Sequence, residues 1–175
     1  SASTLVSADC LLGVKASDPV KKIRDVKIYE EPKENNQYIM LVDVSQGRGQ
    51  DFSTFTVINM TSRPFKQVCT FRDNVMSPLL FPDIIVHTAK YYNEAIVIIE
   101  NNDAGQVVCN GVYYDLEYEN TFVESAIKRG GIGVTMTKKI KRMGCSNMKD
   151  LLEQGGLEIN DPDTILELST FVPKG

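Results

Sequence analysis

The sequence has few residues that could hold a structural zinc ion. Histidine occurs once, at His87, and the four cysteines are widely spaced with no CxxC pair: Cys10, Cys69, Cys109 and Cys145. A zinc site needs several Cys or His ligands at close spacing, so the sequence predicts none. The cysteines fit reduced thiols in a cytosolic protein. A Ser or Cys nucleophile is also disfavoured, because the one imidazole that could activate it falls on the surface of a predicted helix.

Two further absences narrow the functional class. No apolar run approaches the length of a membrane span, which predicts a protein without a membrane partner. The phosphate-binding pattern GxxxxGK[ST] occurs nowhere, which excludes an ATPase of that class for these residues. The 175 residues are 42% hydrophobic and 24% charged, as expected for one soluble globular domain with a sizeable core.

The chain divides into a polar lead-in and a domain. Residues 1–36 form the lead-in, which ends in the loop-forming run EEPKENN at residues 30–36. The sequence leaves open whether the lead-in packs on the domain or acts as a linker. Residues 37–175 are predicted to form the domain.

The pattern of residues 38–125 predicts a layered α/β or α+β domain with a mixed sheet. Residues 38–44 read as a central strand that is apolar on both faces, and two more strands follow after short turns, at residues 54–59 and 65–71. The short turns indicate an antiparallel meander. The later elements are a helix from Pro82 to Asn93, a strand at 95–99, a helix at 103–116, a possible strand at 121–125 and a helix at 147–154.

Two acids stand at the ends of predicted central strands. Asp43 lies in the run YIMLVDV, and Glu100 directly follows AIVII. A charged carboxylate in an apolar strand is costly unless it is paired or binds a cation, and two neighbouring carboxylates repel each other. Oxygen ligands suit Mg²⁺ or Mn²⁺, and two such ions can activate water for phosphodiester cleavage. The alternative is that each acid meets solvent or an Arg at its strand end.

The turn after the first predicted strand adds one more candidate ligand. Asp51 follows the glycines Gly47 and Gly49 and could return toward Asp43 across the hairpin. Asp103 follows Glu100 by three positions and is more simply read as a helix N-cap.

A basic segment interrupts this acidic chain, whose net charge is −4. Residues 125–148 contain no Asp or Glu, and their basic residues are candidates for contacts with a phosphate backbone: Lys128, Arg129, Lys138, Lys139, Lys141 and Arg142. The alternative is a solvated hairpin without a partner.

Several ordered segments resemble a known family. They are similar to the nuclease domain in the large terminase subunit of T-even-type tailed phages, and lie at residues 38–55, 95–106, 114–118, 141–147 and 163–168. The resemblance implies an RNase H-like fold, with a central mixed β-sheet flanked by helices. It also implies a metal-dependent DNA endonuclease.

The resemblance assigns roles to the acids already singled out. Asp43 matches the first catalytic acid of the family, Glu100 the second, and Asp51 a further acidic position associated with the metal site, which would hold two Mg²⁺ or Mn²⁺ ions. The third acid of the family belongs to a motif that would follow Gly175, and Asp161 and Asp163 belong to a different segment. The domain is therefore expected to lack its C-terminal part, which puts metal affinity and cleavage by these residues alone in doubt.

The partners and location also follow from the resemblance. They would be concatemeric double-stranded DNA, a portal protein, a small terminase subunit and an N-terminal packaging ATPase domain of the same protein, at the procapsid portal in the host cytoplasm. Three alternatives remain: a catalytically incomplete portal-docking module, another RNase H-like nuclease such as a junction resolvase, and an actin-like ATPase fold. Portal binding without cleavage would favour the first, and nucleotide binding the last.

Overall fold

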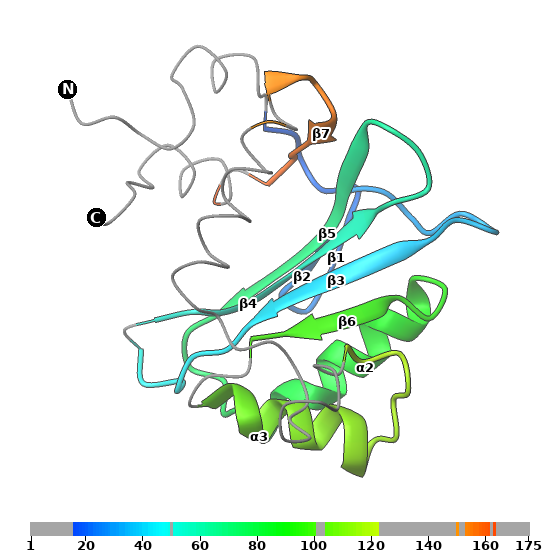
Figure 1. Ribbon diagram of the computed structural model, residues 1–175. Coiled ribbons are helices and arrows are strands. Elements are labelled where there is room, and N and C mark those ends of the chain that lie inside the picture. Colours follow the sequence, from blue (N-terminus) through cyan, green and yellow to red (C-terminus); the bar gives the residue numbers. More distant parts are fainter. Residues whose placement is uncertain are drawn as a thin grey trace.

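The computed structural model describes residues 16–49, 51–100, 104–122, 150, 153–161 and 163. Its strands form one mixed sheet in the order β1-β2-β5-β4-β3-β6, with β7 pairing β5 outside that path. The strands are β1 (Lys21–Ile23), β2 (Val26–Ile28), β3 (Tyr38–Asp43), β4 (Ser53–Asn59), β5 (Phe65–Asp73), β6 (Ile96–Ile99) and β7 (Leu157–Glu158). Figure 1 shows the long strands of the meander crossing the molecule together.

The antiparallel meander is confirmed. β3 pairs antiparallel with β4, and β4 pairs antiparallel with β5. In β4 the side chains alternate between buried and partly buried positions over the whole strand, as expected for a strand covered more deeply on one face. β5 runs two residues further than expected, to Asp73, so Arg72 belongs to the sheet.

A helical crossover leads from the meander to β6. The helix α2 (Phe81–Tyr91) carries a proline in its first turn, as expected, and buries Ile85 and Ala89. The chain then forms β6, which lies parallel to β3. A parallel neighbour requires such a crossover, because a tight hairpin can join only antiparallel strands. His87 is exposed on α2, as predicted.

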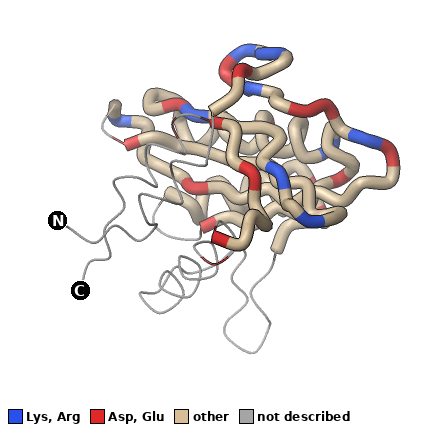
Figure 2. The backbone as a smooth tube through the Cα atoms, turned by 90° about the horizontal axis from the view of Figure 1, so that it is seen from above, with Lys and Arg blue, Asp and Glu red and all other residues tan. Residues whose placement is uncertain are grey.

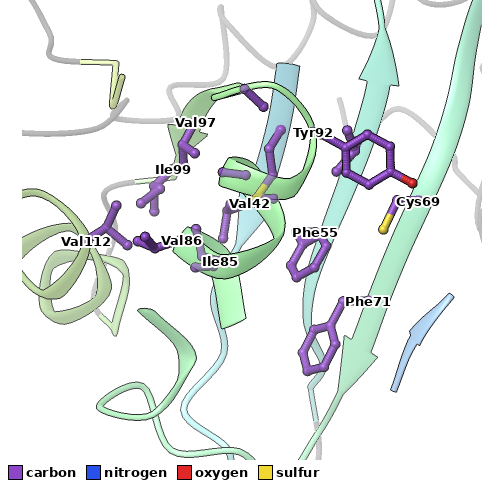
Figure 3. Close-up of a cluster of buried hydrophobic side chains, with 14 of the residues drawn as sticks. Val42, Phe55, Cys69, Phe71, Ile85, Val86, Tyr92, Val97, Ile99 and Val112 are labelled. Carbon is purple, nitrogen blue, oxygen red and sulfur yellow. The ribbon is translucent and has the colours of Figure 1, made fainter. Parts of the chain in front are cut away.

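The core lies between the sheet and the helices on one side of it. Side chains from β3, β4, β5 and β6 meet α2 and the following helix there, and Figure 3 shows Val42, Phe55 and Ile99 in this cluster. Phe55 stacks on Phe71, with the ring centroids 5.3 Å apart. This contiguous apolar cluster supplies the main driving force for folding.

The opposite face of β3 is more open than expected. The sequence predicted a strand buried on both faces, but its side chains alternate, and Leu41 is 39% exposed. The reason is that α2 and the helix α3 (Ala104–Asn110) lie on the same side of the sheet (Figure 1). Within the described ranges, Leu41 and Asp43 therefore face away from the core.

The helix predicted over residues 103–116 consists of two different parts. α3 is followed directly by a π-helix, η1 (Gly111–Asp115), in which the N–H of Leu116 donates to the carbonyl of Gly111. Gly111 lies against α2, where a Cβ would stand 2.5 Å from the Cγ of Pro82. A glycine at this position lets the two helices approach closely.

Part of the lead-in belongs to the sheet. β1 and β2 form a hairpin, and β2 pairs with β5. Residues 21–28 of the lead-in therefore pack on the domain rather than act as a linker. The domain boundary at residue 36 stays a prediction. No helix in the described part of the chain is long and apolar enough to cross a membrane.

The two described cysteines are buried. Burial raises the pKa of the Cys69 thiol to about 12 and that of the Cys109 thiol to about 11. Because the thiolate is the reactive form, both side chains are inert packing residues at neutral pH, in agreement with the expected reduced thiols.

The buried amide of Gln67 attaches a late segment of the chain to the sheet. Its Oε1 accepts hydrogen bonds from the backbone N–H of Asn160 (3.1 Å) and of Asp161 (2.9 Å), and its Nε2 donates to Thr56 Oγ1 at 2.9 Å. The backbone carbonyl of Gln67 also accepts a bond from the Asn160 side chain. One side chain thus joins β4, β5 and residues 160–161.

We expect the Gln67→Leu variant to lose about 2–4 kcal/mol of unfolding free energy, because the buried N–H of Asp161 and the partly buried N–H of Asn160 would lose their acceptor. Urea denaturation measures this loss. The matched control is Thr56→Val, which removes one neutral hydrogen bond and should cost about 1 kcal/mol. Equal stability of Gln67→Leu and the parent would show that the segment is held by other contacts.

Candidate acidic site at the ends of strands β3 and β6

The structure brings Asp43 and Glu100 together. Val42 pairs with Ile99 in the parallel β3–β6 ladder, and the N–H of Glu100 donates to the carbonyl of Val42 at 3.1 Å. The two acids are therefore neighbours in register at the carboxyl ends of adjacent strands. Neighbouring strands lie about 4.8 Å apart, which places the two carboxylates within reach of one cation.

Both acids line the same hollow. It has a volume of about 880 Å³ and lies over the face of the sheet that α2 and α3 leave open. Its walls include Leu41 of β3, Ile98 of β6 and Thr54 of β4. A concave surface with convergent polar groups is the usual setting of a binding site.

The pair of carboxylates is suited in its chemistry to a hard divalent cation. Two like charges side by side repel, and a cation between them removes that repulsion. Carboxylate oxygens are the ligands that Mg²⁺ and Mn²⁺ prefer. Among the residues that the structure describes, no group of three or more His, Cys, Asp or Glu side chains is arranged to hold a metal ion.

The turn that separates β3 from β4 is folded against the end of β5. The N–H of Gly49 donates to the carbonyl of Asn74, and a Cβ on Gly47 would stand 2.4 Å from the carbonyl oxygen of Met76. Both glycines have positive φ, as expected for a tight turn. Asp51 is exposed on this turn and is not among the residues that line the hollow.

Ser53 and Ser45 fix the ends of this turn. The hydroxyl of Ser53 accepts a hydrogen bond from the Ser45 N–H at 2.9 Å, and both residues are buried. Their hydroxyls make hydrogen bonds within the loop.

The other end of the hollow holds a separate polar cluster. Asp161 is only 5% exposed, accepts a hydrogen bond from the Tyr29 hydroxyl at 3.0 Å, and lies 3.8 Å from Lys27 Nζ. Lys27 also lies 4.0 Å from Asp163. Burial, and then the Asp161 carboxylate, raise the pKa of Tyr29 well above its usual value. Asp161 and Asp163 therefore have cationic and hydroxyl partners of their own.

Gly105 sets the backbone position of Glu100. A Cβ on Gly105 would stand 1.9 Å from the carbonyl oxygen of Glu100, a distance that no side chain can occupy. The first turn of α3 thus lies directly against the end of β6. This contact fixes the position of the Glu100 backbone, from which its side chain extends.

Several predicted residues lie outside the described ranges. They are Asp103 and all six candidate DNA contacts: Lys128, Arg129, Lys138, Lys139, Lys141 and Arg142. Over the described backbone, acidic and basic residues are interspersed (Figure 2).

Arg72 and Phe52 also line the hollow, although neither was among the predicted site residues. The guanidinium carbon of Arg72 lies 4.0 Å from the centroid of the Phe52 ring. Thr70 and Arg72 are two positions apart in one strand and both line the hollow. Their spacing could have identified Arg72, but the predicted strand ended at Phe71. Charged and stacked side chains at a site are candidates for ligand contact.

The antiparallel meander and the parallel β6 form the mixed sheet that was expected of an RNase H-like fold. The chain matches the family model described as terminase RNaseH-like domain over residues 40–173, which is most of its length. The protein therefore belongs to the terminase RNaseH-like domain family.

Solved structures with this fold include viral enzymes. The large terminase nuclease of the thermophilic phage G20c with bound magnesium has a TM-score of 0.72 and 18% identity, covering 94% of this chain and 77% of that one. Its cobalt-bound form has a TM-score of 0.74 and 17% identity, covering 94% and 78%. The nuclease domain of the Thermus phage P74-26 large terminase has a TM-score of 0.67 and 20% identity, covering 95% and 77%. The predicted fold is thus confirmed.

The Gly105→Ala variant tests how α3 positions Glu100. The added methyl group would overlap the Glu100 carbonyl, so we expect a loss of about 1–3 kcal/mol in unfolding free energy by urea denaturation. Val107→Ala, on the exposed side of the same helix, is the control and should change stability by less than about 0.5 kcal/mol. A Gly105→Ala protein as stable as the parent would mean that α3 can move away from β6 freely.

Proposed function

We propose that this protein is the metal-dependent endonuclease domain of a viral DNA-packaging terminase, which cuts concatemeric double-stranded DNA by phosphodiester hydrolysis. The observation that carries the proposal is the in-register placement of Asp43 and Glu100 in one hollow, in a member of the terminase RNaseH-like domain family. The fold alone would not assign an activity, because one fold hosts many functions.

In this proposal Asp43 and Glu100 are the catalytic metal ligands. They would hold Mg²⁺ or Mn²⁺, in a two-metal site, and such ions supply an activated water and a stabilised leaving oxygen. The magnesium-bound structure of the G20c nuclease supports a divalent metal for this fold. Asp51 is proposed as a further carboxylate of the site, supplied from the turn between β3 and β4.

The direct test is cleavage of plasmid DNA with Mg²⁺ or Mn²⁺. We expect Asp43→Asn and Glu100→Gln each to lower the cleavage rate by about 100-fold or more, because a neutral amide binds a cation far more weakly than a carboxylate. Glu94→Gln is the matched control, since Glu94 is exposed and precedes β6, whereas Glu100 follows it. Its rate should equal that of the parent.

Two results would count against this proposal. Cleavage that survives in both Asp43→Asn and Glu100→Gln would place the activity elsewhere. Cleavage that persists after chelation of divalent ions with EDTA would exclude a metal mechanism.

We also propose that the basic segment binds the DNA backbone. Lys138, Lys139 and Lys141 belong to a stretch without acidic residues, and each cation placed on a phosphate adds to a salt-dependent attraction. Reversing these three charges to Glu should weaken binding to a DNA duplex by at least about 100-fold at low salt, as measured by fluorescence anisotropy. Unchanged binding would favour a solvated segment without a nucleic-acid role.

The remaining features are proposals from family membership. They are a T-even-type source, an N-terminal packaging ATPase domain, a portal protein and a small terminase subunit as partners, and a location at the procapsid portal in the host cytoplasm. A docking role without cleavage would follow if portal binding persisted in a protein that cannot cut DNA.

A further inference from the structure

The open face of the sheet carries a row of polar side chains that crosses four strands. Thr54 of β4 pairs with Asp43 on one side and with Arg72 on the other, and Glu100 lies beside Asp43. Residues paired across strands point to the same face, and all four line the hollow. Arg72 is therefore two strands, or about 10 Å between backbones, from the acidic pair.

Phe52 fixes the orientation of the Arg72 guanidinium. The guanidinium carbon lies over the ring, 4.0 Å from the ring centroid, within the range of a cation–π contact. Phe52 is 38% exposed and directly precedes β4, so it forms the rim of the hollow beside the turn that follows Asp43. Stacking uses the face of the guanidinium, whereas its N–H donors lie in its plane.

The cationic side chains of the hollow lie in two neighbouring rows of the sheet. Lys27, one row further along the sheet, has Asp161 and Asp163 as ion-pair partners. Arg72 lies in the same row as Asp43 and Glu100. A phosphodiester drawn to a cation on those acids would have its second non-bridging oxygen free for a cationic donor, and a planar guanidinium matches phosphate geometry.

We propose that Arg72 contacts a phosphate of the bound DNA strand beside the acidic pair, and that Phe52 is its positioning residue. This inference rests on the proposed nuclease function and adds the group that holds the substrate. It predicts that Arg72 acts on DNA binding, whereas Asp43 and Glu100 act on metal-dependent cleavage.

The test is the binding of a short fluorescein-labelled DNA duplex in Ca²⁺, followed by anisotropy over a range of KCl concentrations. Removing one phosphate contact lowers the slope of log Kd against log salt by about one. We expect Arg72→Gln to show this loss of slope and about tenfold weaker binding at low salt. Arg72→Lys should keep the slope, because it keeps the charge.

Two other variants separate position from charge. Phe52→Leu should keep the salt slope and weaken binding, because the arginine keeps its charge but loses its stacking surface. Arg63→Gln is the matched control: Arg63 also lies over an aromatic ring, that of Phe65, but in the turn at the other end of β4 and β5. It should bind DNA as the parent does.

The outcomes distinguish this inference from the nuclease proposal. If folded Arg72→Gln binds with the parent's affinity and slope, or if the parent shows no binding at the lowest salt, the inference is overturned, whatever Asp43→Asn does to cleavage. Cleavage retained in Asp43→Asn and Glu100→Gln would instead remove the nuclease proposal. Should Arg72→Gln fail to fold, parent-like affinity of the Phe52→Leu variant would overturn the inference.

Discussion

The parallel pairing of β3 with β6 is the constraint on which the rest of the site depends. It sets two carboxylates side by side at the ends of adjacent strands, Asp43 on β3 and Glu100 just after β6. Two like charges at neighbouring positions are unfavourable in an empty site, and a divalent cation turns the repulsion into binding. In the proposed function, the register of this one ladder places the two metal ligands side by side.

Much of the structure serves to hold that register. α2 makes the crossover that a parallel strand requires, and its buried face packs on the same side of the sheet as α3. Gly105 lets the first turn of α3 lie against the Glu100 carbonyl. The core covers one face of β3 and β6, so the side chains of Asp43 and Glu100 are left on the other, where the hollow lies. The apolar core thus lies on one face of the sheet, and the two acids lie on the other.

Local patterns made most of this predictable. The strands β3, β4 and β6 and the helix α2 were expected to within about two residues, because each shows its own periodicity or turn signal. The convergence of Asp43 and Glu100 was predicted from their places at the ends of two adjacent central strands, and the structure shows that these strands are parallel. β1 and β2 were missed because the short runs KKI and VKI carry little pattern, and the pairing of β2 with distant β5 is invisible locally. Arg72 was missed because the predicted strand ended two residues early, at Phe71. The basic segment, at Lys128 to Arg142, stays a prediction.

The measurement that tests the central claim most directly is the anomalous difference density of crystals soaked in Mn²⁺. The account predicts a peak bound by carboxylate oxygens of both Asp43 and Glu100, at about 2.0–2.2 Å, the distance typical of small divalent cations with oxygen ligands. A manganese ion held instead by Asp161 and Asp163, or one that touches neither Asp43 nor Glu100, would contradict it. In that case the adjacency of the two strand-end acids would be a feature of the fold without a role in metal binding.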